Sequence, residues 1–203
     1  MWIVKLGGSL QDFVDLPALI QTLTNSRHAL IIVPGGGTFA DTVRRSQKRW
    51  RFSDEIAHHM ALLAMDQNAL LLSALDSRLK PFVNLQRMEK LLAVRKVPVW
   101  QPSQMVLAAT GIQQDWTMTS DSLSAWLAKK LSVKGLLLVK SCHVSSAQVT
   151  ATKLSREGIV DQAFPTMVAE SNYQIRVIQR ENYSQLNHLL AGHEVEALQV
   201  SAE

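Results

Sequence analysis

Two glycine-rich segments of this 203-residue chain have the residue types that bind phosphate groups. The first is "KLGGS" and the second is "VPGGGT", and each directly follows an apolar run. Their glycines and the adjoining serine are Gly7, Gly8, Ser9, Gly35, Gly36 and Gly37. Glycine lets backbone N–H groups approach an anion closely, and the N-terminus of a following helix adds a positive potential. We therefore expect both segments to bind phosphate; the alternative is that each is only a tight strand-to-helix turn.

Lys5 is the next candidate, because it interrupts the apolar run "WIVKL". A lysine in a buried strand needs an anionic partner. At the end of a strand it could offset the negative charge that develops on a transferring phosphoryl group. The alternative is an ammonium group that reaches solvent while its stem stays buried.

Asp121 and Lys140 complete the set of candidate catalytic and binding residues. Asp121 lies in "WTMTSDSLSAWLAKKL", near the expected start of a helix. There it could face the glycine segments, orient Lys5 and help to position the magnesium ion of a nucleotide; alternatively Ser120 or Asp121 only caps the helix. Lys140 ends the apolar run "GLLLVK", where it could hold nucleotide phosphates or simply be solvated. Asp161 and Glu170 are interpreted as ordinary surface acids.

The elements that must position these residues follow from the apolar patterns. Short apolar runs predict buried strands at 2–6, 29–33, 97–100, 136–139, 175–178 and 195–200. Helical spacing predicts helices at 16–23, from an N-cap at Thr38 onward, and at 54–75, 121–131, 162–171 and 182–191. Continuous apolar strands alternating with helices favour an α/β fold, an αβα sandwich around a mostly parallel sheet. Ligands of such sheets bind beyond the carboxyl ends of the strands, where both glycine segments and Lys140 lie. The polar segment 141–153 is predicted to be a long loop.

Composition narrows the class of protein and of partner. The chain is 47% hydrophobic and 19% charged, as in ordinary globular domains, and its length suits one large domain or two small lobes. A net charge of +4 permits a phosphorylated ligand. The basic run "RRSQKRWR" lacks an aromatic stacking platform, so we expect a solvated helix face and no nucleic acid, or one arginine that grips an acceptor phosphate. One cysteine, Cys142, and no apolar stretch of about 20 residues favour a cytoplasmic protein without membrane contact.

The segments "KLGGSL", "VPGGG" and "TSDSLSAWLA" resemble the amino acid kinase superfamily. The resemblance implies a single domain over residues 1–203, with an acceptor-binding part at about 1–115 and a nucleotide-binding part at about 116–203. It implies ATP and Mg²⁺ as cofactors, a small phosphorylated substrate and a homo-oligomer. No dedicated metal site is expected, because His58 and His59 are neighbours on a predicted helix and point about 100° apart. Lys5 and Asp121 match the family's catalytic residues, the glycines match its phosphate-binding loops, and Lys140 matches its nucleotide-side lysine.

Further segments are most similar to the superfamily's kinases of methanofuran biosynthesis. These are "MWIVKLGGSL", "VPGGGTFAD", "MALLAMDQNALL", "W-x-x-T-S-D-S-L-S" and "GIVDQAFPTM". Such kinases make a diphosphate from an aminomethylfuran-methyl phosphate, for a C1 carrier of one-carbon metabolism. One departure is "KSCHVSS", which stands where the family usually has a "T-D-V-D-G-V/I-Y" nucleotide loop. Two alternatives stay open: a non-catalytic ligand-binding or assembly protein, and an acetylglutamate, uridylate or isopentenyl phosphate kinase.

Overall fold

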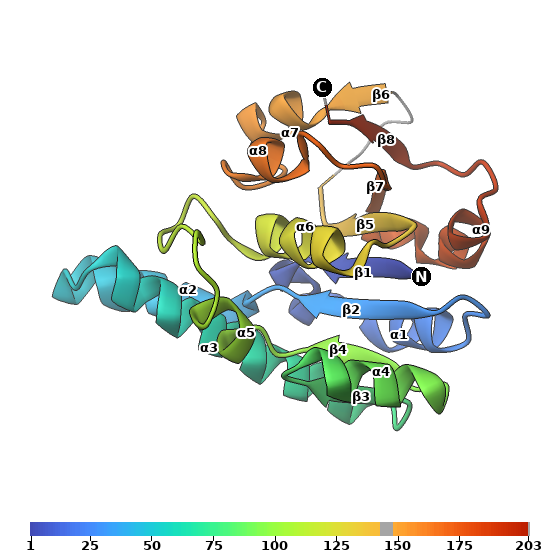
Figure 1. Cartoon of the computed structure of the whole chain (residues 1–203), viewed down its shortest axis with the longest axis horizontal. Coiled ribbons are helices and arrows are strands. Elements are labelled where there is room, and N and C mark those ends of the chain that lie inside the picture. Colours follow the sequence, from blue (N-terminus) through green and yellow to red (C-terminus); the bar gives the residue numbers. More distant parts are fainter. Residues whose placement is uncertain (143–147, 203) are drawn as a thin grey trace.

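A computed structural model, which describes residues 1–142 and 148–202, arranges the strands in one sheet of eight. Their order across the sheet is β3-β4-β2-β1-β5-β7-β8-β6 (Figure 1). The strands are β1 (Trp2–Leu6), β2 (Leu30–Pro34), β3 (Leu79–Phe82), β4 (Val97–Trp100), β5 (Gly135–Lys140), β6 (Gln148–Thr150), β7 (Gln174–Gln179) and β8 (Leu198–Ser201). Every pairing is parallel except that of β7 with β8. The α/β sandwich with a mostly parallel sheet is therefore confirmed.

Helices cover both faces of the sheet and form two hydrophobic cores. On one face lie α4 (Leu85–Ala93), α5 (Ser103–Leu107), α6 (Ser120–Leu131), α7 (Ala151–Arg156) and α8 (Phe164–Val168). On the other lie α1 (Leu16–Thr24) and α9 (Leu186–Ala191), with the 3₁₀ helices η1 (Gly8–Asp12) and η2 (Arg180–Gln185). The side chains of the central strand β1 alternate between the two cores, so Ile3 and Lys5 both point toward the face that α6 covers.

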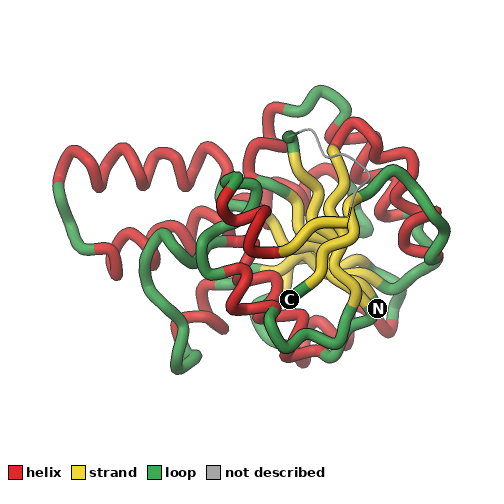
Figure 2. Tube along the Cα trace, turned by 90° about the horizontal axis from the view of Figure 1, so that it is seen from above, coloured by secondary structure: helices red, strands yellow, loops and turns green. Residues whose placement is uncertain are grey.

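The helices α2 (Gly37–Trp50) and α3 (Asp54–Leu75) form a hairpin that extends beyond the sheet (Figure 2). Ser53 caps α3 by accepting a hydrogen bond from the Ile56 N–H at 3.4 Å, and Asp54 and Glu55 lie in the first turn, where carboxylates are favourable. The prediction of a helix at 54–75 is confirmed. The N-cap predicted at Thr38 is wrong, because α2 has Gly36 at its N-cap and the Thr38 N–H and hydroxyl both donate to Oε1 of Gln11.

The patterns missed two edge strands and the helices α4, α5 and α7. Strand β3 contains Lys80 and Pro81, which an edge strand tolerates and a central strand does not. Part of the loop predicted at 141–153 is wrong, since 148–150 form β6 and α7 begins at Ala151; residues 143–147 lie outside the described residues. Of the helices described, none is long and apolar enough to cross a membrane.

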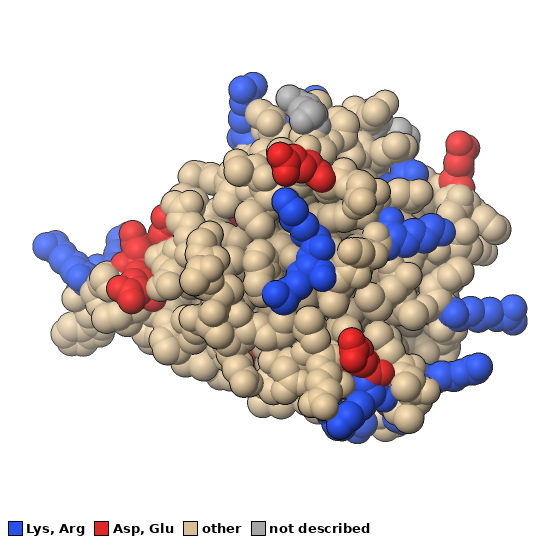
Figure 3. All heavy atoms as spheres, in the orientation of Figure 1, with Lys and Arg blue, Asp and Glu red and all other residues tan. Residues whose placement is uncertain are grey.

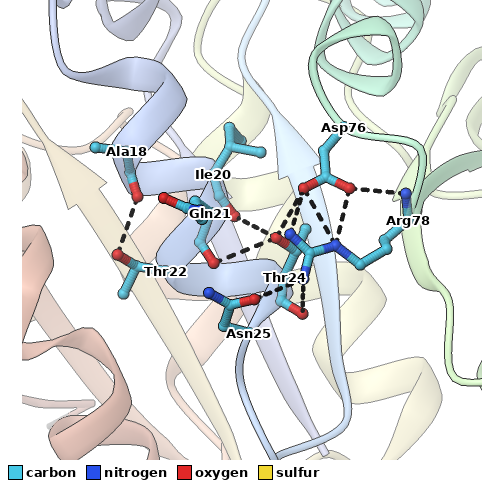
Figure 4. Close-up of polar contacts among 8 residues, drawn as sticks. All are labelled: Ala18, Ile20, Gln21, Thr22, Thr24, Asn25, Asp76 and Arg78. Carbon is cyan, nitrogen blue, oxygen red and sulfur yellow. Dashed lines mark hydrogen bonds and ion pairs between the residues drawn. The ribbon is translucent and has the colours of Figure 1, made fainter.

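Asp76 joins the end of α1 to the turn between α3 and β3 (Figure 4). Its carboxylate accepts hydrogen bonds from Nη2 of Arg78 at 2.6 Å, from the Arg78 backbone N–H at 2.8 Å and from the Thr24 hydroxyl at 3.1 Å. Arg78 also donates to Oδ1 of Asn25 at 2.6 Å. The hydrogen bonds from Arg78 hold the pKa of Asp76 well below its usual value of 3.8.

We expect Asp76→Asn to lower the free energy of unfolding by about 1–3 kcal/mol at neutral pH. Because the pKa of Asp76 is depressed in the folded state, its contribution is fully present above pH 3.8 and is lost progressively as the pH falls from there toward the depressed value. Urea unfolding of both proteins at pH 7 and pH 2 measures this, and the stability difference between them should be smaller at pH 2. An equal difference at both pH values would contradict the assignment.

Candidate active site

Three charged side chains from three elements meet under the carboxyl ends of the central strands. Nζ of Lys5, on β1, lies 2.8 Å from Oδ1 of Asp121, in the first turn of α6. Lys140, the last residue of β5, donates to both carboxylate oxygens of Asp121, at 2.8 and 2.7 Å. All three are buried, with exposed fractions of 3%, 5% and 9% for Lys5, Asp121 and Lys140. The structure thus brings together the three charged residues singled out from the sequence.

This triad of Lys5, Asp121 and Lys140 leaves one buried positive charge without a partner inside it. Burial lowers the pKa of Lys5 to about 8, even though Asp121 raises it, and the nearby Lys140 lowers it further. Burial alone would raise the pKa of Asp121, but Lys140 and Lys5 outweigh it and lower that pKa to about 2. Asp121 is therefore ionised at neutral pH and Lys5 is mostly protonated. A net positive charge in a buried site favours an anionic ligand.

The two glycine segments touch each other beside the triad, backbone against backbone. A Cβ on Gly8 would lie 2.5 Å from the Gly37 nitrogen, and one on Gly35 would lie 2.5 Å from the Gly8 nitrogen. The Gly7 N–H donates to the Val139 carbonyl and the Gly35 N–H donates to that of Leu6, so these two groups extend the sheet. Gly8, Ser9, Gly36 and Gly37 instead line a cavity. Of the predicted phosphate-binding residues, these four are placed to meet a ligand.

That cavity has a volume of about 310 Å³ and lies between the glycine segments, the α2–α3 hairpin and the start of α6. Its apolar wall consists of Ala40, Ala61, Leu62, Met65, Met118 and Leu123. Its polar lining consists of Ser9, Asp12, Thr38, Asp41, Arg44, His58, Thr119 and Ser120, with the ring of Trp116. The cavity therefore offers apolar contact together with charged groups of both signs, which suits a small polar ligand with a ring.

Arg44 is the residue of the basic run that reaches this cavity. Its guanidinium lies 3.8 Å from the ring centroid of Trp116, whose Nε1 donates to Oε1 of Gln47 at 2.7 Å. Arg45, Lys48, Arg49 and Arg51 are exposed and lie outside the cavity. On the face shown in Figure 3, Lys and Arg side chains are scattered among acidic ones rather than gathered in one patch. The run thus combines a solvated helix face with one arginine at the site.

The start of α6 depends on a residue that the sequence patterns missed. Asp161 accepts hydrogen bonds from the Thr119 N–H at 2.9 Å, the Thr119 hydroxyl at 2.8 Å, the Ser122 N–H at 3.1 Å and the Ser122 hydroxyl. The interpretation of Asp161 as an ordinary surface acid is therefore wrong. The predicted caps are also not seen, since the N-cap is Thr119 and its side chain makes no capping bond.

The residues present fit the phosphates of ATP better than they fit a metal ion of their own. The buried positive charge at Lys5 and Lys140 and the glycines of the cavity suit phosphate oxygens. Both oxygens of Asp121 are taken by lysines, so it is not placed as a magnesium ligand. Among the residues described, no group of three His, Cys, Asp or Glu side chains could hold a metal. Most of the atypical "KSCHVSS" segment, from 143 onward, lies outside the described residues.

Comparisons with known proteins agree with this geometry. The chain is 26% identical over 205 residues to the [5-(aminomethyl)furan-3-yl]methyl phosphate kinase of Methanocaldococcus jannaschii, covering 95% of this chain and 94% of that protein. The uridylate kinase of Archaeoglobus fulgidus superposes with a TM-score of 0.74 at 16% identity, over 98% of this chain and 99% of that one. The UMP kinase of Bacillus anthracis gives 0.73 at 14% identity, over 100% and 96%. These two structures share the fold.

The family itself is shown by a match that spans most of the chain. Residues 1–147 match the family described as "Amino acid kinase family", and they include both glycine segments and all three residues of the triad. The relatives found are kinases, as the site chemistry leads one to expect. The chain therefore belongs to the amino acid kinase family.

Proposed function

We propose that the chain is an ATP-dependent kinase that phosphorylates the phosphate group of [5-(aminomethyl)furan-3-yl]methyl phosphate, for a methanofuran-like C1 carrier. The observation that carries the proposal is the buried Lys5–Asp121–Lys140 triad beside a cavity lined by the glycine segments. The named activity of the Methanocaldococcus jannaschii relative supports the choice of acceptor. A cytoplasmic location is part of the proposal, because a chain with one cysteine gains no internal disulfide from an oxidising compartment.

The cavity supports an acceptor that carries a ring, a phosphate and an amine. Leu62, Met65 and Leu123 offer apolar contact for a furan ring. The glycines face the place where the acceptor phosphate would lie, and Asp12 and Asp41 supply carboxylates for an ammonium group. A uridylate has no ammonium group, so these carboxylates favour the aminomethylfuran phosphate.

The proposed reaction needs positioning and charge stabilisation rather than a covalent intermediate. An oxygen of the acceptor phosphate attacks the γ-phosphorus of ATP, and the bond between that phosphorus and the oxygen of the leaving ADP breaks. The Lys5 ammonium stabilises the charge that develops on the transferred group, while Asp121 holds Lys5 and Lys140 in place. Magnesium bound with ATP would neutralise phosphate charge.

An acceptor profile of the purified protein tests the proposal. With Mg-ATP we expect ADP release with the aminomethylfuran phosphate, and less with the analogue that lacks the amine, UMP, isopentenyl phosphate or acetylglutamate. Asp12→Asn and Asp41→Asn should raise KM for the amine-bearing acceptor and leave KM for the analogue unchanged. A higher rate with one of the other acceptors would reject the aminomethylfuran assignment.

The second candidate is a non-catalytic binding or assembly protein, and the "KSCHVSS" segment favours it because this segment lacks the family's acidic nucleotide-loop residues. Calorimetric titration separates the two candidates. A kinase should bind ATP with micromolar affinity, whereas a non-catalytic protein should bind a phosphorylated metabolite tightly and ATP weakly or not at all.

The pH dependence of the reaction should follow the charge of Lys5. Because the pKa of Lys5 is lowered to about 8, we expect kcat/KM to be level near neutrality and to fall above about pH 8 as the ammonium is deprotonated. Lys5→Arg stays charged at every accessible pH, so whatever activity it retains should not show this fall. A wild-type profile that stays level to pH 10 would show that the charge of Lys5 is not needed.

Gly8→Ala should separate the two glycine segments. The new Cβ would meet the backbone of Gly37 at 2.5 Å, so we expect kcat/KM to fall at least about 100-fold as phosphate groups lose their alignment. Gly158→Ala is the matched control, because in the described part of the chain no atom beyond its immediate neighbours lies within 4 Å of the added Cβ and only its φ of +69° is unfavourable. Equal activity of the two variants would show that the close contact does not matter.

We also propose that the chain forms a homo-oligomer through α3. The helix exposes an apolar stripe about 29 Å long, formed by Ile56, Met60, Leu63, Leu70, Leu71 and Leu75. Between His59 and Leu75 the only Asp, Glu, Lys or Arg is Asp66, which accepts a hydrogen bond from the Ser103 N–H, so no like charges oppose a second copy. Sedimentation should give an oligomer for the wild type and a monomer for the double variant Leu63→Glu, Leu70→Glu; a monomeric wild type at micromolar concentration would reject the proposal.

A further inference from the structure

Asp161 ties the turn between α7 and α8 to the first turn of α6, although the two are far apart in the chain. Its carboxylate accepts bonds from Thr119 and Ser122, which lie 42 and 39 residues away. The Thr119 side chain gives no cap of its own, so Asp161 supplies the oxygen atoms that an N-cap side chain would provide. Asp161, a residue of the C-terminal part of the chain, thus fixes the position of the first turn of α6.

The turn that carries Asp161 is itself firmly held. The Phe164 N–H donates to the Asp161 carbonyl at 3.2 Å, and the Ser155 hydroxyl donates to the same oxygen at 3.3 Å. The Ala163 N–H donates to the Thr117 carbonyl at 2.9 Å, so the turn also contacts the segment before α6. The Phe164 side chain is fully buried in the core. Asp161 therefore sits on a rigid support and can transmit its position to α6.

The first turn of α6 is the part of the helix that contributes residues to the triad and to the cavity. Asp121 lies between the residues that Asp161 holds, and Thr119 and Ser120 line the cavity. A shift of this turn would move the Asp121 carboxylate away from Nζ of Lys5, which is 2.8 Å distant. Both lysines depend on that one carboxylate within the triad, so its position decides where their charges lie.

We propose that Asp161 is a positioning residue of the phosphoryl-transfer site, one that places Asp121 and, through it, the ammonium groups of Lys5 and Lys140. The inference rests on the proposed function for its kinetic consequences. The geometry predicts a larger effect on turnover than on acceptor binding, because Asp161 itself does not line the cavity and reaches it only through Thr119. It also makes the C-terminal turn part of the catalytic geometry, not only of the core.

The negative charge of Asp161 should also have a measurable effect on the pKa of Lys5. The groups that act on Lys5 are Asp121 on α6, Lys140 on β5 and Asp161 on the α7–α8 turn, and Asp161 raises the pKa of Lys5. Loss of its negative charge should therefore lower the pKa of Lys5 further below about 8. Loss of a carboxylate that does not act on Lys5, such as Glu170, should leave this titration unchanged.

The kinetic test compares Asp161→Asn and Ser122→Ala with the wild type. We expect Asp161→Asn to lower kcat about 10- to 100-fold with KM for the acceptor within a few-fold, and to move the alkaline limb of kcat/KM to lower pH. Ser122→Ala removes one of the bonds and no charge, so it should lower kcat less and leave the limb in place. Glu170→Gln is the control, because Glu170 is an exposed carboxylate of the same part of the chain, paired only loosely with Lys129 at 3.7 Å.

A direct titration of Lys5 makes the test independent of turnover. In protein with ¹³C-labelled lysine, the Cε resonance of Lys5 should titrate at lower pH in Asp161→Asn than in the wild type, and amides 119–123 should exchange faster with solvent. If the wild type is an active kinase but Asp161→Asn changes neither the titration of Lys5 nor kcat, the positioning role of Asp161 is overturned and the proposed function stands. If the wild type shows no turnover but Asp161→Asn still shifts the titration of Lys5, the effect of Asp161 on Lys5 stands and the proposed function is rejected.

Discussion

Lys5→Met is expected to lower kcat by about 100- to 1000-fold, the usual cost of removing a group that stabilises a developing negative charge. Methionine keeps most of the buried volume of the lysine stem in the central strand, and Asp121 keeps Lys140 as its partner. The fold should therefore survive while the transferring phosphoryl group loses its nearest ammonium. Single-turnover kinetics with saturating Mg-ATP and acceptor measure the effect on the chemical step.

Lys129→Met is the matched control for this change. Lys129 lies on the same helix as Asp121, but its side chain is exposed and contacts Glu170 only at 3.7 Å, so its loss should leave kcat unchanged. Circular dichroism and thermal unfolding of both variants show whether the fold is intact. If a folded Lys5→Met variant turned over within a few-fold of the wild type, Lys5 would have no catalytic role.

Asp121→Asn should have the largest combined effect, on stability and on turnover together. It leaves two buried ammonium groups without a carboxylate, and breaking a buried ion pair in this way costs about 3–5 kcal/mol of unfolding free energy. Because the pKa of Asp121 is lowered to about 2, its contribution is present above the usual value of 3.8 and is lost as the pH falls through about 2. Denaturant unfolding at pH 7 should show the full loss, with little or no turnover.

A double variant distinguishes a loss of activity caused by the missing carboxylate from one caused by unfolding. Adding Lys140→Met to Asp121→Asn removes one of the orphaned charges, so the double variant should regain part of the lost stability without regaining activity. Equal stability of Asp121→Asn and the wild type at pH 7 would contradict the assignment of a buried ionised triad.

The central strands and the glycine segments could be predicted because local sequence determines them. Leu30–Pro34 and Val97–Trp100 are short apolar runs buried on both faces, and glycines beyond a strand mark a place where backbones approach closely. The pairing of Lys5 with Asp121 can also be predicted, since a lysine in an apolar strand needs an anionic partner.

The rest depends on contacts that local patterns do not contain. Strand β3 contains a proline and a lysine, so its sequence does not have the apolar pattern of a buried strand, and only its place at the edge of the sheet explains why these residues are tolerated. The sequence pattern leaves Lys140 either on nucleotide phosphates or in solvent, and only the alignment of β5 beside β1 shows that it reaches Asp121. Asp161 acts on residues about 40 positions away, so no spacing in its own segment marks it as the cap of α6. Local sequence also does not show that the N–H groups of Gly7 and Gly35 donate to neighbouring strands and so extend the sheet, whereas other glycines of the two segments line the cavity.

The phosphoryl transfer is tested most directly by the ³¹P NMR spectrum of the aminomethylfuran phosphate after incubation with the protein and Mg-ATP. We expect the single acceptor resonance to be replaced by two coupled resonances of a diphosphate, together with the signals of ADP, and we expect Lys5→Met to leave the acceptor resonance in place. An acceptor resonance that persists in the presence of folded wild-type protein and ATP, or a phosphoryl group that appears on the amine, would contradict it.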